Sequence, residues 1–255
     1  MHPNNKNRPA TSRAKFHWLA IVTIVAPAIA LAGPWEVGSV SPSKTMKVKA
    51  EVTYKHTDNK DTWARPVIKF AGPLTPDMSY EFSGGYGIVE KDGGFERGGS
   101  RDISAKIKWR LLRESASHPV FLVEPKVTFG SGDQQAGISD GVTTLKLPLR
   151  AAKTFGKMRV TGETFYTRSF DHAEDDMVGY GGLVEYRVSE PLLIGIDLLA
   201  DRPTGDPGKY HLRSNVAFKW YPTKKFEVQG LIGRSIENHR GKLATSAKLV
   251  TAYKF

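Results

Sequence analysis

The sequence predicts an all-β protein, a transmembrane antiparallel up-and-down β-barrel of about 12 strands. Three observations predict this fold. Segments that alternate apolar with polar residues recur along the chain, with the period of two that β-strands show. These segments are about 10 to 13 residues long, which suits tilted strands that cross a bilayer. The last of them runs into the C-terminus and ends on an aromatic residue, Phe255, as is typical of outer-membrane barrels.

Taken in order, the alternating segments predict strands at 44–56, 62–72, 78–90, 101–113, 118–130, 141–152, 157–169, 177–189, 191–202, 209–221, 225–236 and 242–255. The connections after even-numbered strands are short, such as 73–77 and 153–156. After odd-numbered strands they are mostly longer, glycine-rich and charged, such as 91–100 and 131–140. Bacterial outer-membrane barrels show this asymmetry, with an even strand number and with short turns in the periplasm.

Residues 1–32 have the pattern of a secretory signal peptide. Lys6, Arg8, Arg13 and Lys15 form a basic n-region, an apolar h-region follows from 18 to 31, and Ala30-Leu31-Ala32 is a small-residue cleavage site. The apolar run is shorter than the roughly 18 residues that a membrane-spanning helix needs. We therefore expect a cleaved signal peptide and a single barrel domain at 33–255.

Charge and cysteine content fit an exported barrel. The 255-residue chain has no cysteine, so disulfides cannot hold it together. Its net charge of +11 includes the four cations of the n-region, and removing them leaves +7 for residues 33–255. A basic protein can bind nucleic acid, but an exported one meets little of it. We expect no nucleic-acid partner, and the position of the cations becomes the question.

One face of each predicted strand suits lipid. Aromatic residues on this face gather in two bands near the strand ends, as in the girdles of membrane barrels. The band near the short turns contains Phe70, Tyr80, Trp109, Phe121, Trp220, Phe226, Tyr253 and Phe255, and the other contains Tyr54, Tyr86, Phe129, Tyr166, Tyr180 and Tyr210. Outer-membrane lipid is the expected surroundings, and the barrel-assembly machinery is an expected partner through the C-terminal strand ending at Phe255.

The opposite face is charged. Its sixteen cations are Lys47, Lys49, Arg65, Lys69, Lys106, Lys108, Arg110, Lys126, Lys146, Arg150, Arg159, Arg187, Arg213, Lys219, Lys225 and Lys248. Its eight carboxylates are Glu51, Glu81, Glu124, Glu163, Glu185, Asp197, Asp201 and Glu227. Arg or Lys facing hydrocarbon costs roughly 2–4 kcal/mol at the bilayer midplane, so these residues must face a polar lumen.

The excess of cations favours a channel for passive uptake of small polar or anionic organic solutes. We expect Lys106, Lys108 and Arg110 to form a ladder along one strand, and the full set of pore-lining candidates is Lys106, Lys108, Arg110, Glu124, Lys126, Lys146, Arg150, Arg187 and Arg213. The alternative is a plugged barrel, structural or ligand-binding, in which the cations pair with the carboxylates and with inward-folded loops.

No enzyme site is predicted. His211 has the lumen parity and Ser214 the lipid parity, so the two point apart. The acidic segment 171–176 holds His172 and gives a weaker alternative, an outer-membrane hydrolase with a loop-borne site, although such loop tips are usually solvated. The glycine clusters at 84–87 and 179–182 follow strand periodicity and are not cofactor motifs. We expect no cofactor and no metal site.

Three stretches of the chain resemble a known family. They are 102–112, the segment Thr128-Phe129-Gly130-Ser131-Gly132-Asp133, where the family tends to show Pro-Thr-Gly-Asp, and 231–235 with the ending Tyr253-Lys254-Phe255. This pattern resembles the transporter family named for the meta-pathway of phenol degradation. The resemblance implies an outer-membrane barrel linked to uptake of organic compounds. By architecture the chain is also similar to small twelve-stranded acidic-sugar channels of the outer membrane.

Overall fold

The structure is a computed structural model that describes residues 35–58, 60–91, 95–171 and 176–255. The expected signal peptide and the middle of the acidic segment at 171–176 lie outside these ranges. The strands are β1 (Lys47–Thr57), β2 (Lys60–Thr75), β3 (Met78–Lys91), β4 (Phe95–Ser100), β5 (Ser104–Leu112), β6 (Val120–Val123), β7 (Lys126–Thr128), β8 (Thr144–Phe155), β9 (Met158–Ser169), β10 (Met177–Ser189), β11 (Leu192–Pro203), β12 (His211–Trp220), β13 (Phe226–Asn238) and β14 (Thr245–Lys254).

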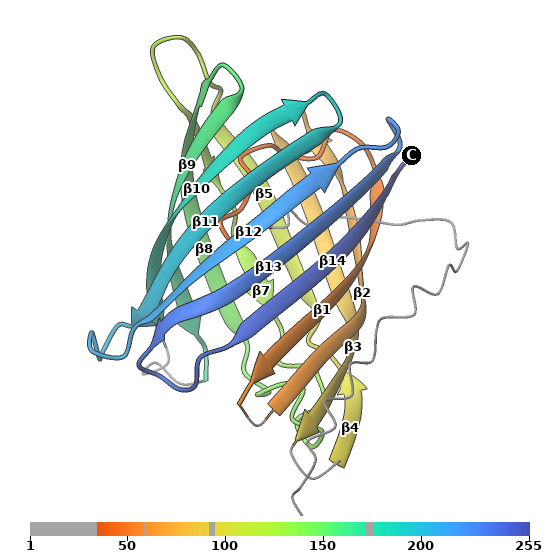
Figure 1. Cartoon of the computed structure of the whole chain (residues 1–255), viewed down its shortest axis with the longest axis vertical. Helices are drawn as coiled ribbons and strands as arrows, with labels where there is room; N and C mark the ends of the chain where they lie inside the picture. Colours follow the sequence, from red (N-terminus) through yellow and green to blue (C-terminus); the bar gives the residue numbers. More distant parts are fainter. Residues whose placement is uncertain (1–34, 59, 92–94, 172–175) are drawn as a thin grey trace, which may run out of the picture.

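These strands form one closed antiparallel sheet (Figure 1). Strand β1 pairs with β2 on one side and with β14 on the other, so neither edge stays open. Strands β4 and β5 pair with successive halves of β3, and β6 and β7 both lie between β5 and β8. Each of these pairs fills one strand position, so fourteen segments make a twelve-stranded barrel. The predicted fold class and strand number are confirmed.

Two local expectations are wrong. The predicted loop at 91–100 contains β4, because the β3 hairpin continues past the rest of the barrel, with Tyr86 opposite Ser100. Arg65 was expected in the lumen, but the register between β2 and β3 shifts between Ala64 and Val67. A bulge of this kind changes which face a residue occupies. The exposed guanidinium of Arg65 lies 5.2 Å from the ring of Trp63, outside the lumen.

The two faces of the barrel differ as the alternation predicts. In β9, the outward Val160 and Tyr166 are exposed, whereas the inward Thr161, Glu163 and Phe165 are buried. Exposed outward aromatic residues lie near both ends of the barrel: Trp109, Phe121, Trp220 and Phe255 at the short turns, and Tyr86, Phe129, Tyr166 and Tyr180 at the longer loops. Soluble monomers rarely expose an apolar surface of this extent, so this exterior requires lipid.

The longest described connection, between β7 and β8, folds back onto the barrel. The carboxylate of Asp102 accepts hydrogen bonds from the Gly132 amide (2.9 Å) and the Ser139 hydroxyl (2.6 Å). The amide of Asp133 donates to the carbonyl of Ser100 at 2.9 Å. This loop is therefore fixed beside the β4–β5 connection at one end of the barrel. Among the described residues, no helix is long and apolar enough to cross a membrane.

Candidate functional site in the barrel interior

Residues 35–43, here called the N-terminal segment, lie inside the barrel (Figure 1). Trp35 and Val37 are 4% and 0% exposed, and they pack against inward residues of five consecutive strands, β9 to β13. These residues are Phe165, Leu183, Leu199, Ala217 and Leu231, and we call them the apolar wall. Burying an aromatic and an aliphatic side chain together stabilises this arrangement by several kcal/mol, at about 25 cal/mol per Å² of apolar surface.

Two glycines of the same region make room for the segment. A Cβ atom on Gly195 would lie 2.8 Å from the indole nitrogen of Trp35. A Cβ atom on Gly181 would lie 2.8 Å from a methyl carbon of Val37. Any larger residue would push the segment away from the wall, so the two glycines form its seat.

Polar contacts fix the segment at several points. The carboxylate of Asp197 accepts hydrogen bonds from the amides of Glu36 (2.7 Å) and Val37 (3.3 Å). Further along, the amide of Gly38 donates to Glu163 at 3.2 Å. The ammonium of Lys108 donates to the carbonyl and hydroxyl oxygens of Ser39 at 3.0 and 3.1 Å. The segment is thus tied to strands on both sides of the lumen.

The N-terminal segment separates two cavities. The turn-side cavity has a volume of about 380 Å³ and is lined by Ser39, Ser41, Pro42 and Ser43 of the segment. The loop-side cavity has a volume of about 610 Å³ and is lined by Glu36 of the segment. The two cavities share no lining residue. The segment is therefore the constriction of the barrel interior.

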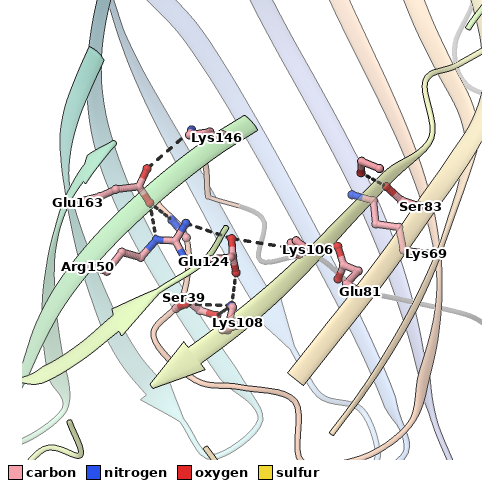
Figure 2. Close-up of polar contacts among 12 residues, drawn as sticks. Ser39, Lys69, Glu81, Ser83, Lys106, Lys108, Glu124, Lys146, Arg150 and Glu163 are labelled. Atoms are coloured by element: carbon pink, nitrogen blue, oxygen red, sulfur yellow. Dashed lines mark hydrogen bonds and ion pairs between the residues drawn. The ribbon is translucent and has the colours of Figure 1, made fainter. Parts of the chain in front are cut away.

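Charged side chains opposite the apolar wall form an alternating network (Figure 2). The ammonium of Lys106 lies 3.2 Å from Glu81 and 3.8 Å from Glu124. Glu124 also pairs with Lys108 at 3.1 Å and with Arg150 at 3.2 Å. The network then continues from Arg150 to Glu163, and from Glu163 to Lys146 at 4.0 Å. Buried charges of both signs are compensated here, as burial demands.

The structure brings together five of the nine pore-lining candidates in this network: Lys106, Lys108, Glu124, Lys146 and Arg150. Lys126 lies opposite Lys106 and Lys146 in the sheet register, and it makes no ion pair with any residue that the structure describes. Its cationic neighbours include Lys69. Lys126 thus lies on a lysine-rich surface without an ion pair of its own among the described residues.

The other three candidates lie elsewhere. Arg110 does not extend the ladder into the lumen, because it pairs with Asp77 of the β2–β3 turn at 2.6 Å. Arg187 lines the turn-side cavity and donates to the carbonyl of Glu190 at 3.1 Å. Arg213 reaches into the loop-side cavity and pairs with Glu36 of the N-terminal segment and with Asp201.

At the turn end of the barrel, the side chains of Asp77, Arg110 and Arg113 form a cluster of three charges. Hydrogen bonds from the guanidinium groups of Arg113 and Arg110 lower the pKa of Asp77 to about 2. The Arg113 contact is bidentate, with nitrogen–oxygen distances of 2.9 and 2.7 Å. Asp77 thus fastens the β2–β3 turn to the end of β5.

The inner lysines of the uncovered side form a second surface, here called the basic wall: Lys49, Lys69, Lys106, Lys126 and Lys248. Lys49 and Lys106 line the turn-side cavity, and Lys248 lines the loop-side cavity. Lys69 lies within electrostatic range of both Lys106 and Lys248. The basic wall therefore extends from one cavity to the other, on the side that the apolar wall does not occupy.

Sequence reasoning missed the N-terminal segment and the apolar wall. A signal for them was present, because Phe165, Leu183, Leu199, Ala217 and Leu231 occupy lumen positions on five consecutive strands. Apolar residues at those positions are out of place in a water-filled lumen, and they predict that something apolar covers them.

A serine and a histidine also meet inside the loop-side cavity. The Nε2 atom of His211 lies 2.8 Å from the hydroxyl of Ser235, and Nδ1 lies 3.3 Å from a guanidinium nitrogen of Arg213. Because a guanidinium only donates, Nδ1 accepts and Nε2 carries the proton that bonds to Ser235. A catalytic base needs the opposite tautomer. This pair therefore does not support the hydrolase alternative.

The acidic segment 171–176 is engaged at both of its described ends. Asp171 accepts the amide of Thr143 at 2.9 Å, and Asp176 accepts the amide of Ser169 at 2.8 Å. Its residues 172–175, including His172, lie outside the described residues. No group of three His, Cys, Asp or Glu side chains that fits a metal ion occurs in the described part of the chain.

Comparison with known proteins places the fold. No family model and no curated protein matches the chain. Similar solved structures include an outer membrane channel from Pseudomonas putida F1, which is 15% identical, has a TM-score of 0.66, and aligns over 88% of this chain and 100% of that one. The NanC porin is 8% identical, with a TM-score of 0.61 over 82% and 100%. The KdgM porin is 13% identical, with a TM-score of 0.52 over 81% and 99%. The chain thus has the fold of an outer-membrane β-barrel.

Proposed function

We propose that the protein is a passive channel of the bacterial outer membrane, which admits small polar or anionic organic solutes. The observation that carries this proposal is the division of the interior. The N-terminal segment covers the apolar wall, and the basic wall lies on the other side of the lumen, with Lys49 and Lys106 at the turn-side cavity and Lys248 at the loop-side cavity. Cations beside a narrow aqueous path raise the local concentration of anions and favour their passage.

Location in the outer membrane is part of the same proposal. The exposed apolar exterior requires lipid, and residues 1–32 have the pattern of a cleaved export signal. Similar barrels are described as an outer membrane channel and as porins. Phe255 at the end of the last strand is the expected contact for the assembly machinery.

Planar-bilayer recording on the refolded full chain tests the channel. We expect discrete current steps and anion selectivity under a KCl gradient at low salt. The selectivity should fade near 1 M KCl, where the Debye length falls to about 3 Å. Folded protein, recognised by heat-modifiable migration on gels, that gives no current would support the plugged barrel instead. A cation-selective current would contradict the role of the basic wall.

A further inference from the structure

The loop-side cavity has the size of a small-molecule site. Its volume of about 610 Å³ falls within the roughly 300–1,000 Å³ of typical ligand pockets. Strands β1 and β2 line one side of it, and they contribute Thr53 and Thr62, which carry hydroxyl groups. Apart from Ala64, Leu231 and Ala244, its lining residues are polar or charged. The cavity therefore suits a hydrophilic solute.

Each carboxylate of this cavity already has a cationic partner. Glu36 pairs with Arg213, and Asp201 pairs with Arg213 and Arg240. Glu51 pairs with Lys69, with the ammonium 2.8 Å from the carboxylate oxygen. Glu51 also lies within electrostatic range of Lys248, although the two form no ion pair.

Three cations of the same cavity form no ion pair in the described part of the chain. Lys55, Arg101 and Lys248 line it, and the structure gives none of them an ion pair or a side-chain hydrogen bond within its described residues. Arg234 also borders the cavity, but strand alternation puts its side chain on the outer face, so it does not belong to this set. Three unpaired cations around a recess produce a positive potential that attracts anions.

The positions of these cations define two poles. In the β1–β14 register, Lys55 lies opposite Ser246, and Lys248 lies opposite Thr53. The two lysines are diagonal neighbours, about 7–8 Å apart at the backbone, so both ammonium groups can reach one carboxylate. Arg101 follows β4, beyond β2 and β3, about three strand spacings or roughly 14 Å from β1. Its guanidinium offers a fork for a second carboxylate.

From this arrangement we propose that the loop-side cavity binds a small hydroxylated dicarboxylate. Lys55 and Lys248 hold one carboxylate, Arg101 holds the other, and the hydroxyls of Thr53 and Thr62 bond to the hydroxyl groups between them. Thr62 lies opposite Lys55 in the β1–β2 register, so it lies beside the lysine pair that holds the first carboxylate. The inference rests on the proposed channel and names the class of solute that its loop-side cavity selects.

The test uses three probes with the same six-carbon chain: glucarate with two carboxylates, gluconate with one, and glucitol with none. Each is added to the loop side of the full-length channel in a planar bilayer, and the block of the KCl current is measured. We expect glucarate to block at a concentration about tenfold lower than gluconate, and glucitol not to block. The variant Lys55→Gln/Arg101→Gln/Lys248→Gln should need about tenfold more glucarate.

A matched variant controls for lost charge. Arg113→Gln/Lys209→Gln/Lys224→Gln removes three exposed cations outside both cavities and should leave the glucarate block unchanged. If the channel conducts but glucarate and gluconate block alike, or if the cavity variant blocks like the wild type, the site is refuted while the channel stands. If folded protein carries no current, calorimetric titration of the detergent-solubilised full chain with glucarate still decides. Binding that the cavity variant loses supports the site, and no binding overturns it.

Discussion

The apolar wall and the basic wall lie on different sides of the same barrel interior, and they differ in what contacts them. Trp35 and Val37 of the N-terminal segment pack against the apolar wall, and the contact is buried. On the basic wall, Lys106 lies between two carboxylates, whereas Lys126 makes no ion pair among the described residues. The difference shows that an inward position alone does not tell whether a residue lines an open lumen. What packs against the residue decides this.

The largest effect is expected in the charge network of the basic side. Replacing Arg150 by Met leaves Glu124 and Glu163 buried without their guanidinium, which should destabilise the barrel by about 3–5 kcal/mol. Urea unfolding in lipid vesicles measures this. Arg159→Met removes a more exposed arginine that pairs with Glu114, and it should cost at most about 1 kcal/mol. Equal losses for both variants would mean that the network does not hold the wall.

The apolar wall is tested by filling the seat of the N-terminal segment. Gly195→Leu adds a side chain where Trp35 lies, so the segment should leave the wall and the current step should rise about twofold or more. Gly182→Leu is the matched control, because a Cβ atom there meets nothing within 4 Å. If both variants conduct like the wild type, the segment does not limit the current.

A smaller effect on stability and selectivity is expected from replacing single lysines of the basic wall, and it should differ between lysines with and without an ion pair. Lys126→Gln removes a cation without an ion pair, so we expect unchanged stability and a lower preference for anions in reversal-potential measurements. Lys106→Gln removes a partner of both Glu81 and Glu124, and it should lower stability by about 1–3 kcal/mol as well as selectivity. If the two variants lost the same stability, the ion pairs of Lys106 would not contribute to holding the basic wall.

The smallest effect is expected at the turn end, outside both walls. Because contacts with Arg113 and Arg110 lower the pKa of Asp77 to about 2, below its ordinary 3.8, its contribution is complete above about pH 4. It should disappear as the pH falls toward 2. Asp77→Asn should therefore unfold at a slightly lower temperature than the wild type at pH 7, and at the same temperature at pH 2. A difference that persists at pH 2 would point to packing instead of charge.

Much of the interior could be read from residue parity. Lys106, Lys108, Glu124, Lys146 and Arg150 were predicted to face the lumen, and the structure places them together there, while their part in conduction stays a prediction. Arg110 has the right parity but lies close enough to the turn to pair with Asp77. Arg65 was misplaced because a bulge interrupts the alternation. Residue parity predicts which face of a strand a side chain occupies. It does not predict the side chain's ion-pair partner or the position of a β-bulge.

The closed barrel could be predicted from the sequence alone, because a period of two with lipid-compatible residues on one face leaves few other solutions. The sequence also predicted a charged interior, with more cations than carboxylates at lumen positions. The position of residues 35–43 in the lumen could be learned only from the folded structure, because their contacts come from strands more than a hundred residues away, such as Asp197 and Glu163. Contacts of that range leave no periodic signal in the segment itself, so closure of the barrel around the segment was needed to reveal them.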